Sequence, residues 1–516
     1  MAPTTGKAYQ RRWWTLLVLS VSLLVISLDN TILNVALPTI ERDLGASASD
    51  LQWIVDSYTL VFAGLLLMMG SLGDRFGRRR ALVVGLGIFG AGSLLSALAG
   101  SADTLIASRA LMGVGGALIM PSTLSILTNV FPAEERPKAI GIWAAVAGLG
   151  IAIGPVGGGW LIEHFDWSSV FLVNLPIVAL ALAAAPALVP ESRDPKKSRL
   201  DPLGAVLSTT GLGALTWAII EGQHGWTAPG PLAGFGVALV ALTAFVVWEL
   251  RTPSPMLDVR LFRVSRFTGA SVSIALVFFS LFGAIFFLTM YLQEVKDYEP
   301  LAAGLRITPV ALGLVLGGPL SAKLAERLGT RAVVAAGLTI VATALVLMSG
   351  ADAATAYSSL AAALVLLGFG MGATMAPATE SIMSSLPLAH AGVGSAMNDT
   401  VRLVGGTLGV AILGSLLSGQ YGADMEGAVK DLPAPAQAAA EGSVGGASAV
   451  AERIGGDAGA TLSRIAESAY TSAMGTTMLV AAGVAMAGAL VALLVLPGRE
   501  RERVEKRAIM AELVPA

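Results

Sequence analysis

The feature that most constrains this chain is a series of long segments without Asp, Glu, Lys or Arg. Segments of this kind recur throughout the 516 residues, and examples are 81–102, 110–133, 167–190, 267–293 and 353–379. A helix needs about 20 mainly apolar residues to cross the roughly 30 Å hydrocarbon layer, which leaves backbone groups no partner outside their own helix. The sequence therefore predicts an all-α polytopic membrane protein rather than a β-barrel, which would show shorter alternating segments.

About fourteen spans are expected along the chain. Their ranges are 13–38, 51–72, 81–101, 103–130, 138–162, 168–189, 202–220, 230–249, 267–292, 301–322, 332–350, 355–383, 395–418 and 473–497. With the N-terminus inside, most of the 33 Lys and Arg residues fall on cytoplasmic segments, among them Arg78–Arg80, Lys196–Lys197 and the tail 499–507. Because basic residues favour the cytoplasmic side, we expect both termini in the cytoplasm and a multi-pass protein of the plasma membrane.

The composition excludes several classes of function. There are no cysteines, which rules out disulfides and thiolate metal sites, and the net charge of -2 indicates no attraction to nucleic acid. The three histidines, His164, His224 and His390, fall on different loops on both sides of the membrane. No metal site and no catalytic cluster of a membrane enzyme is therefore expected. The chain also lacks a nucleotide-binding P-loop, which excludes transport powered by ATP within it.

One connection, residues 419–470, stands apart by its length and its Ala-, Gly- and Glu-rich composition, with Pro433 and Pro435 near its start. A loop this long is usually either functional or disordered. We expect a disordered outer loop or, alternatively, a short ordered hairpin over the outer mouth, because the stretch "AERIGGDAGATLSRIAESA" has some helical pattern.

An internal repeat is visible in two inner loops. "GSLGDRFGRRR" follows the second span and "GPLSAKLAERLGTR" follows the tenth, and each is a short basic loop entered through glycine. If both loops follow the second span of a half, spans 7 and 8 are an insertion. The expected parts are an N-terminal six-helix lobe at 1–190, a linker with two extra helices at 191–266 and a C-terminal six-helix lobe at 267–516. Such duplication places a substrate site between the halves, with alternating access by rocking.

Five ordered stretches carry a family resemblance. They are "LDNTILNVALP", "GSLGDRFGRRR", "LIASRALMGVGGA", "GLGIAIGPVGGGW" and "WSSVFLVNLP". With these motifs the chain resembles the major facilitator superfamily, and within it the fourteen-span drug:proton antiporter family that exports quaternary ammonium compounds, dyes and methyl viologen. Ser168 and Ser169 depart from the Arg and Trp usual in that family's sixth helix. The resemblance implies the major facilitator fold, with two six-helix lobes and two inserted helices.

Asp29 is a carboxylate inside the first span, where such a group is costly and by default indicates an ion or substrate pathway. Burial disfavours the charged form, so the group can alternate between holding a proton and attracting a cation. We expect Asp29 to face a polar cavity between the lobes and to share the outer half of the first lobe with Asp56 and Arg109. The resemblance implies proton coupling for Asp29 and Arg109, and cation recognition or coupling for Asp56.

From the residues alone, each of these three positions has a second interpretation. Asp29 can be a packing residue hydrogen-bonded to Asn30, Asn34 or a neighbouring span. Asp56 can be solvated in the outer headgroup layer, and Arg109 can be a structural partner of a carboxylate.

In the second half, Glu380 interrupts span 12, and Asp399 and Arg402 lie at i and i+3 near the start of span 13, so that they can pair on one helix face. All three are expected toward the cytoplasmic side. Two interpretations remain open. Glu380 is either a second acidic site that binds substrate in the cavity, or a member of an inner-gate network with Asp399 and Arg402.

The first inner loop is expected to act in conformational change rather than in substrate binding. Gly73 and Gly77 permit a tight turn, while Asp74 can pair with a nearby arginine or with a helix N-terminus. The resemblance implies that this loop is a latch between spans that stabilises one access state. The motif positions in question are Gly70, Asp74, Arg75, Gly77 and Arg78.

The fifth span carries a second structural motif, which consists of Gly150, Gly154, Pro155 and Gly158. Its glycines let helices approach closely, and its proline removes a backbone donor and kinks the span. The resemblance implies that this motif has a direction-specific role in exporters.

Span 9 carries Phe278, Phe282 and Phe286 at i, i+4 and i+8, on one face of a helix. These rings could provide cation–π contacts, and we take Phe282 and Phe286 as candidate substrate contacts. The alternative is contact with lipid or with other helices.

These observations together predict a proton-coupled secondary exporter of lipophilic, cationic drugs, dyes or biocides. The expected protein is a monomer that works without catalytic residues, metal or cofactor, with protons as the coupling ion. The alternatives are an uptake symporter and an exporter of an endogenous metabolite or lipid, both of the same superfamily.

Overall fold

The computed structural model describes residues 7–498 except 45, 47, 194–200, 223–224, 254 and 388–389. The predicted basic tail at 499–507, the Lys196–Lys197 pair and His224 lie outside the described residues.

Helices dominate the described residues, which contain no β-strand, as the charge-free segments predict. The elements are α1 (Lys7–Gln10), α2 (Arg12–Leu44), α3 (Ala48–Phe76), α4 (Arg78–Ala97), α5 (Ala102–Val130), α6 (Arg136–His164), α7 (Ser169–Leu172), α8 (Asn174–Leu188), α9 (Pro202–Gly222), α10 (Pro229–Arg251), η1 (Val259–Arg263), α11 (Ser265–Met290), η2 (Tyr291–Val295), α12 (Pro300–Ile307), α13 (Pro309–Leu328), α14 (Thr330–Ser349), α15 (Tyr357–Ser384), α16 (Ala391–Val429), α17 (Ala434–Gly442), α18 (Val444–Ile454) and α19 (Gly456–Val495).

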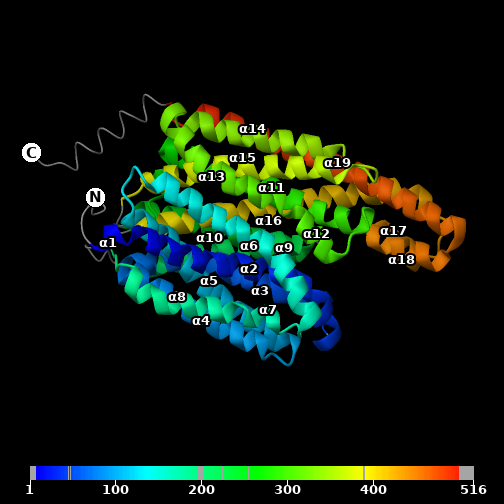
Figure 1. The fold of residues 1–516 in the computed structure, drawn as a ribbon, viewed down its shortest axis with the longest axis horizontal. Coiled ribbons are helices and arrows are strands. Elements are labelled where there is room, and N and C mark those ends of the chain that lie inside the picture. The colour runs from blue at the N-terminus through cyan, green and yellow to red at the C-terminus, as the bar shows by residue number, and fades with distance from the viewer. Residues whose placement is uncertain are drawn as a thin grey trace, which may run out of the picture.

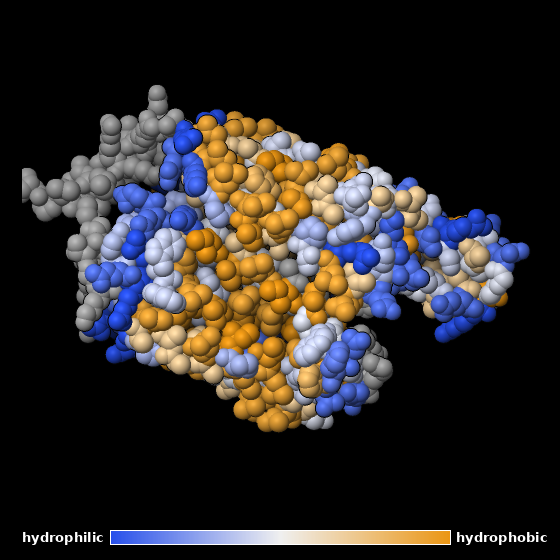
Figure 2. Space-filling model, viewed as in Figure 1, coloured by the Kyte–Doolittle hydropathy of each residue, from blue (hydrophilic) through white to orange (hydrophobic). Residues whose placement is uncertain are grey.

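Thirteen helical segments of the described chain are long and apolar enough to cross a membrane, and the 29-residue helix α6 covers the predicted fifth span. On the face shown in Figure 2, apolar residues form a broad belt across the middle, and hydrophilic residues gather at the two ends. This distribution is that of an all-α polytopic membrane protein, so the expected fold class is confirmed.

The two inner loops of the internal repeat turn in the same way. Gly77 separates α3 from α4 with a φ of 119°, and Gly329 separates α13 from α14 with a φ of 86°. Both angles lie in the region that favours glycine, because a side chain there meets its own backbone. The glycine at the end of each loop motif is therefore what lets two long helices join with almost no connection.

The long helices form two groups. Helices α2 to α6 and α8 pack together as the N-terminal lobe, and α11, α13 to α16 and α19 pack together as the C-terminal lobe. Figure 1 shows the helices running side by side along the length of the molecule, with α1 and the end of α19 at the same end.

The two most extensive helix pairs between the lobes are α6 with α13 and α3 with α16, and α5 with α16 and α6 with α15 add to them. The two most extensive pairs approach through glycine. A Cβ atom on Gly70 would lie 2.6 Å from the carbonyl oxygen of Gly392, and one on Gly141 would lie 3.0 Å from the carbonyl carbon of Gly318. Because α3 and α13 carry the two copies of the inner loop, the two contacts are related as the repeat requires.

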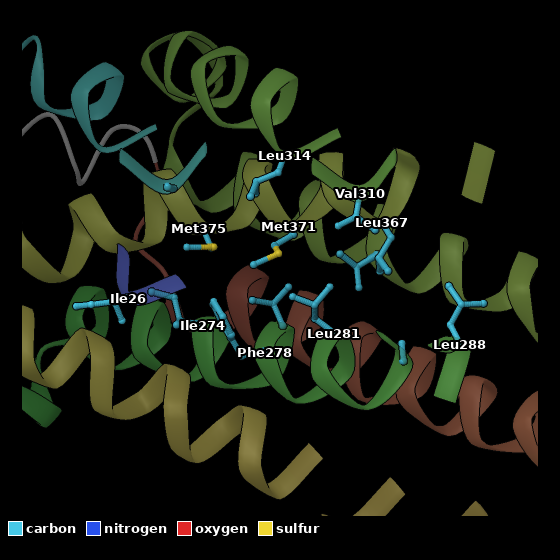
Figure 3. Packing of buried hydrophobic residues seen from close by; sticks show 14 of the residues in the cluster. Ile26, Ile274, Phe278, Leu281, Leu288, Val310, Leu314, Leu367, Met371 and Met375 are labelled. Atoms are coloured by element: carbon cyan, nitrogen blue, oxygen red, sulfur yellow. The ribbon is translucent and has the colours of Figure 1, made fainter. Parts of the chain in front are cut away.

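Apolar side chains fill the interior between the lobes. In Figure 3, Ile26 of α2 lies beside Ile274 and Phe278 of α11, with Met371 and Met375 of α15 opposite. These residues belong to one cluster of buried hydrophobic side chains that includes both lobes. The buried interior here is therefore apolar and closely packed.

Helices α9 and α10 form an antiparallel pair beside this two-lobe body. Helix α9 packs against α3 and also touches α16. The inner ends of the pair are joined by Asp201, whose two carboxylate oxygens accept hydrogen bonds from the indole N–H of Trp248 at 2.8 and 2.9 Å. A small apolar cluster attaches the pair to the lobes; its members are Leu67, Leu212, Phe245, Met256, Leu257, Val393 and Ala396.

The outer segment 419–470 is mostly helical, so of its two predicted interpretations the disordered loop is wrong and the ordered segment with helical pattern is confirmed. Helix α16 continues to Val429 and α19 begins at Gly456, and they measure 39 and 40 residues. At 1.5 Å per residue each is roughly 60 Å long, about twice the hydrocarbon thickness. Both helices therefore continue well past the predicted outer ends of spans 13 and 14, at residues 418 and 473. Their extensions, with α17 and α18 at the tip, project from the C-terminal lobe (Figure 1).

Tyr421 is expected to hold this outer extension together. Its hydroxyl donates to the carbonyl oxygen of Ala440 at 3.0 Å, and its buried ring meets Tyr470 edge-on at 6.5 Å. Replacing Tyr421 by Ala removes a large buried ring at a cost of about 3 kcal/mol or more, so the extension should loosen. Limited trypsinolysis of the purified protein should then cut at Lys430 and Arg453 much faster than in wild type.

The matched control is Tyr421→Phe, which keeps the ring and loses a hydrogen bond of about 1 kcal/mol, so most protection should remain. Rapid cleavage of the wild-type protein at these two basic residues would contradict a packed extension.

Candidate functional site

The centre of the N-terminal lobe holds a buried ion pair between Asp29 on α2 and Arg109 on α5. The guanidinium Nη1 lies 2.5 Å from the carboxylate Oδ2, and the two residues are 0% and 1% exposed. Arg109 also donates from Nε to the backbone carbonyl of Ile54 at 3.2 Å, and it lies 4.6 Å above the ring of Tyr58. The pair therefore connects α2, α3 and α5.

Asn174 completes the environment of Asp29, and the sequence analysis did not select it. Its side-chain amide donates to Asp29 Oδ1 at 2.9 Å and to the hydroxyl oxygen of Ser93 at 3.1 Å. Ser93 in turn donates to the carbonyl oxygen of Phe171 at 2.8 Å. The signal was present in the motif "WSSVFLVNLP", where Asn174 is a lone amide in an apolar span.

Asp29 does not face a polar cavity between the lobes, contrary to expectation. Its carboxylate lies inside the N-terminal lobe, with α5 and α8 as its hydrogen-bonding neighbours. The packing interpretation, which included a hydrogen bond to a neighbouring span, was therefore correct about its surroundings, since Arg109 lies on α5 and Asn174 on α8. Asp56 lies half-buried on α3, two residues after Ile54, whose carbonyl oxygen accepts from Arg109.

In the C-terminal lobe, Asp399 and Arg402 form the expected i, i+3 pair on α16, with Nη1 3.4 Å from Oδ1. Asn398 joins them, because its amide nitrogen donates to Asp399 at 3.3 Å and its oxygen accepts from the Thr379 hydroxyl at 3.1 Å. This network joins α16 to α15.

Arg402 also lies at the contact between the lobes. Its guanidinium is 5.6 Å from the ring of Trp143 on α6 and 4.7 Å from the ring of Phe278 on α11. Trp143 is fully buried and donates its indole N–H to the hydroxyl of Thr123 at 3.3 Å. A charged group of one lobe is thus stacked against an aromatic ring of the other.

The candidate substrate residues of the C-terminal lobe lie in different surroundings. Glu380 is half-buried on α15, next to Thr379 of the network around Asn398. Phe282 is half-buried and packs edge-on against the buried Phe278 at 5.5 Å, whereas Phe286 is 47% exposed. The phenylalanine face of α11 therefore runs from the interior to the surface. Among the described residues, no group of His, Asp and Glu side chains is placed to hold a metal ion.

The glycines of the fifth-span motif bring α6 against α2. A Cβ atom on Gly150 would lie 2.6 Å from the Cβ of Ser27, and one on Gly158 would lie 2.7 Å from Cγ1 of Ile32. Gly154 would clash with the hydroxyl of Thr31. The predicted close approach is confirmed, and its partner is the helix that carries Asp29. Pro155 lies in α6, but its side chain is outside the description.

The first inner loop forms a direct bond between the lobes. Asp74, at the end of α3, accepts hydrogen bonds from the backbone N–H groups of Gly392 at 2.8 Å and Val393 at 3.1 Å, in the first turn of α16. It also accepts from Nε of Arg78 at 2.7 Å. The structure thus shows both partners that the sequence suggested for Asp74, an arginine and a helix N-terminus, where a carboxylate is favourable.

The rest of the loop is held by the segment after α8. Glu191 forms ion pairs with Arg79 at 3.7 Å and Arg80 at 3.9 Å. A Cβ atom on Gly77 would lie 2.8 Å from the Glu191 carboxylate, and the φ of 119° at this position also favours glycine. Arg75 is half-buried beside the ring of Phe76.

Comparison with known proteins gives a consistent result. The profile of the Major Facilitator Superfamily matches residues 19–410. The chain is 39% identical over 490 residues to "Multidrug efflux pump LfrA" of Mycolicibacterium smegmatis, covering 95% of this chain and 97% of the relative. It is 34% identical over 501 residues to "Tetracenomycin C resistance and export protein" of Streptomyces glaucescens, covering 96% and 93%. It is 33% identical over 420 residues to "Methyl viologen resistance protein SmvA" of Salmonella typhimurium, covering 80% and 84%.

Solved structures share the fold. The human organic anion transporter MFSD10 superimposes with a TM-score of 0.62 at 14% identity, covering 95% of this chain and all of that one. A bacterial homologue of the human lysosomal transporter Spinster, in an inward-facing and unoccupied conformation, gives a TM-score of 0.56 at 21% identity, covering 96% and 100%.

Breaking the buried ion pair is expected to destabilise the protein strongly. Arg109→Gln leaves Asp29 buried without its cationic partner, and such a loss costs about 3–5 kcal/mol. The double variant Asp29→Asn/Arg109→Gln removes both charges and should be more stable than Arg109→Gln alone. Thermal unfolding in detergent measures both.

The control is Asp103→Asn, which removes an exposed carboxylate from the same helix α5 and should leave the melting temperature unchanged. Strictly additive effects of the two site substitutions would show that the two charges do not interact.

Removing the charge of Asp74 is expected to open the inner contact between the lobes. Asp74→Asn cannot accept both backbone N–H groups and the Arg78 side chain as a carboxylate does, and hydrogen bonds to a charged group contribute about 1.5–3 kcal/mol. Because the chain has no cysteine, a single Ser395→Cys in the first turns of α16, where the native side chain is buried, reports this opening. Maleimide labelling should become about tenfold faster in Asp74→Asn.

Glu326→Gln is the matched control, because Glu326 occupies the corresponding inner loop and is exposed. Unchanged labelling in Asp74→Asn would mean that its bonds to α16 do not hold the lobes together.

Proposed function

This chain belongs to the major facilitator superfamily, and we propose that it is a proton-coupled exporter of lipophilic, cationic drugs, dyes or biocides. The relatives named for multidrug efflux, for tetracenomycin C export and for methyl viologen resistance support export. The observation that carries proton coupling is the buried pair of Asp29 and Arg109, because it places one protonatable carboxyl group in the interior of a membrane lobe.

The coupling step follows from the contacts of Asp29. Protonation of the carboxylate removes the charge that holds Arg109, so the guanidinium is left with the Ile54 carbonyl and the Tyr58 ring. Helix α2 is then less strongly held by α5, while its opposite side still packs on the glycines of α6. Because α6 packs on α13 of the other lobe, a shift of α2 reaches the contact between the lobes.

The two glycine contacts between the lobes lie near the inner ends of their helices, and they must separate for access from the cytoplasm. The bonds of Asp74 to α16 stabilise the state in which they are closed. In this proposal, proton movement at Asp29 changes the balance between this state and the open one.

Substrate recognition is proposed for residues away from this pair. Asp56 and Glu380 would supply negative charge, and Phe282 and Phe286 would supply aromatic surface. A lipophilic cation needs both negative charge and aromatic surface, because its charge is stabilised by a carboxylate or a ring face and its apolar parts pack against apolar side chains.

Cellular location, oligomeric state and the need for a cofactor complete the proposal. We place the protein in the plasma membrane as a monomer with both termini in the cytoplasm, on the distribution of Lys and Arg. No cofactor is proposed besides the coupling protons.

The test is ethidium transport in inverted membrane vesicles with an imposed acidic interior. Wild-type vesicles should accumulate ethidium as protons leave, and Asp29→Asn should abolish this for every cationic substrate. Glu380→Gln should reduce transport of some compounds more than others, because it changes recognition rather than coupling. Glu326→Gln, an exposed acidic position, is the control and should transport normally.

Three outcomes would overturn parts of the proposal. Full transport by Asp29→Asn would remove it from the coupling pathway. Equal loss of monovalent, divalent and neutral compounds in Glu380→Gln would favour the inner-gate interpretation. Proton-driven accumulation of substrate in whole cells would indicate an uptake symporter instead.

A further inference from the structure

An apolar cavity of about 460 Å³ lies between the α9–α10 pair and the two lobes. Its walls come from Leu67 of α3, Leu212 of α9, Phe245 of α10, and Met397 and Thr400 of α16. These positions lie about six to ten residues from the inner ends of their helices, which is roughly 9–15 Å into the membrane from that side. The cavity therefore lies in the inner half of the bilayer.

Two arginines stand at the mouth of this cavity. Arg260 and Arg263 line it from η1, the short segment that joins α10 to α11. Both are exposed, and no ion pair joins either of them to a carboxylate among the residues that the structure describes. The carboxylate of Asp258 accepts a hydrogen bond from the backbone N–H of Arg260 at 3.0 Å and keeps its negative charge. With two arginines against this one carboxylate, the segment 258–263 at the mouth still carries a net positive charge.

The same segment has the character of a membrane interface. Phe262, which also lines the cavity, and Val264 are 41% and 43% exposed beside the two arginines. Exposed aromatic and apolar side chains next to arginines are typical of the headgroup level, where the apolar part enters the acyl region and the charge meets phosphate.

From this arrangement we propose that the cavity binds an anionic phospholipid of the inner leaflet. One acyl chain occupies the apolar cavity, and the phosphate lies between Arg260 and Arg263. The charge pattern selects this occupant, because two guanidinium groups attract a phosphate and repel a lipophilic cation. The site is thus distinct from the proposed path of the exported compound.

Because of the position of the cavity, a lipid bound there affects the transport cycle. Leu67 is one turn from Gly70, and Met397 is within two turns of Gly392, so the lipid touches both helices of the α3–α16 contact. A chain in this cavity contacts both helices at once only while they stay together. The lipid therefore stabilises the state in which the inner side is closed.

The experiment is lipid retention by the purified full-length protein, measured by native mass spectrometry against dioleoylphosphatidylglycerol, with dioleoylphosphatidylcholine as the uncharged comparison. Wild type should retain one phosphatidylglycerol. In Arg260→Gln/Arg263→Gln this binding should weaken about 30-fold, the combined effect expected of two basic residues near anionic lipid.

The matched control is Arg327→Gln/Arg331→Gln, which removes two arginines from the inner loop of the C-terminal lobe and should bind like wild type. A second variant, Ser208→Phe, fills the cavity from α9 and leaves both arginines in place, so it should also lose the lipid. Size-exclusion profiles confirm that each variant is folded.

Several outcomes would overturn the proposal. Wild-type binding by folded Arg260→Gln/Arg263→Gln would show that the arginines hold no lipid. Equal retention of phosphatidylcholine would remove the charge selectivity. Displacement of the lipid by millimolar glycerol 3-phosphate would identify a site for soluble phosphate esters instead, and displacement by ethidium would assign the cavity to the exported compound.

Discussion

The buried ion pair of Asp29 and Arg109 is the interaction on which the N-terminal lobe depends. Neither charge is tolerated alone in a dry interior, so the lobe must keep α2 and α5 in one relative position as long as both are charged. Asn174 and the carbonyl of Ile54 occupy the other hydrogen-bonding directions and extend the constraint to α8 and α3. A single proton is the smallest change that releases this constraint, which makes the pair suited to coupling as well as to structure.

The contact between the lobes has the opposite character, because it is built mainly from surfaces that can separate. Gly70 meets Gly392, and Gly141 meets Gly318, with backbones in contact at these two points. The charged bonds differ between the two copies. Asp74 binds the first turn of α16, whereas Glu326 in the corresponding loop is exposed. The repeat therefore sets the geometry of both contacts, and the energy that distinguishes closed from open is concentrated on one side.

Whether a contact could be predicted from the sequence depended on how far apart its two residues lie along the chain. Charge-free segments identified the spans, and helical spacing identified Asp399 with Arg402, because those partners are three residues apart. The partners of Asp29 lie 80 and 145 residues away, so spacing could not select them or show that Asp29 points into its own lobe. The sequence could not decide between a loop and an ordered segment at 419–470, because an Ala-, Gly- and Glu-rich composition suits a solvated helix as well as a loop.

The position of α9 and α10 beside the lobes gives this helix pair a role in the proposed lipid site. Helix α9 lies along α3 and touches α16, and α10 packs on α9. The contact between α3 and α16 has glycine on both sides and is closed by the bonds of Asp74. A pair of helices placed there changes the lateral opening between the lobes from a seam exposed to lipid into a bounded cavity, with arginines at its inner mouth. Such a cavity can admit one lipid tail and exclude bulk lipid. In the proposal, the α9–α10 pair thus turns a variable lipid environment at the moving contact into a defined one, which lets the bilayer influence the access equilibrium through a single molecule.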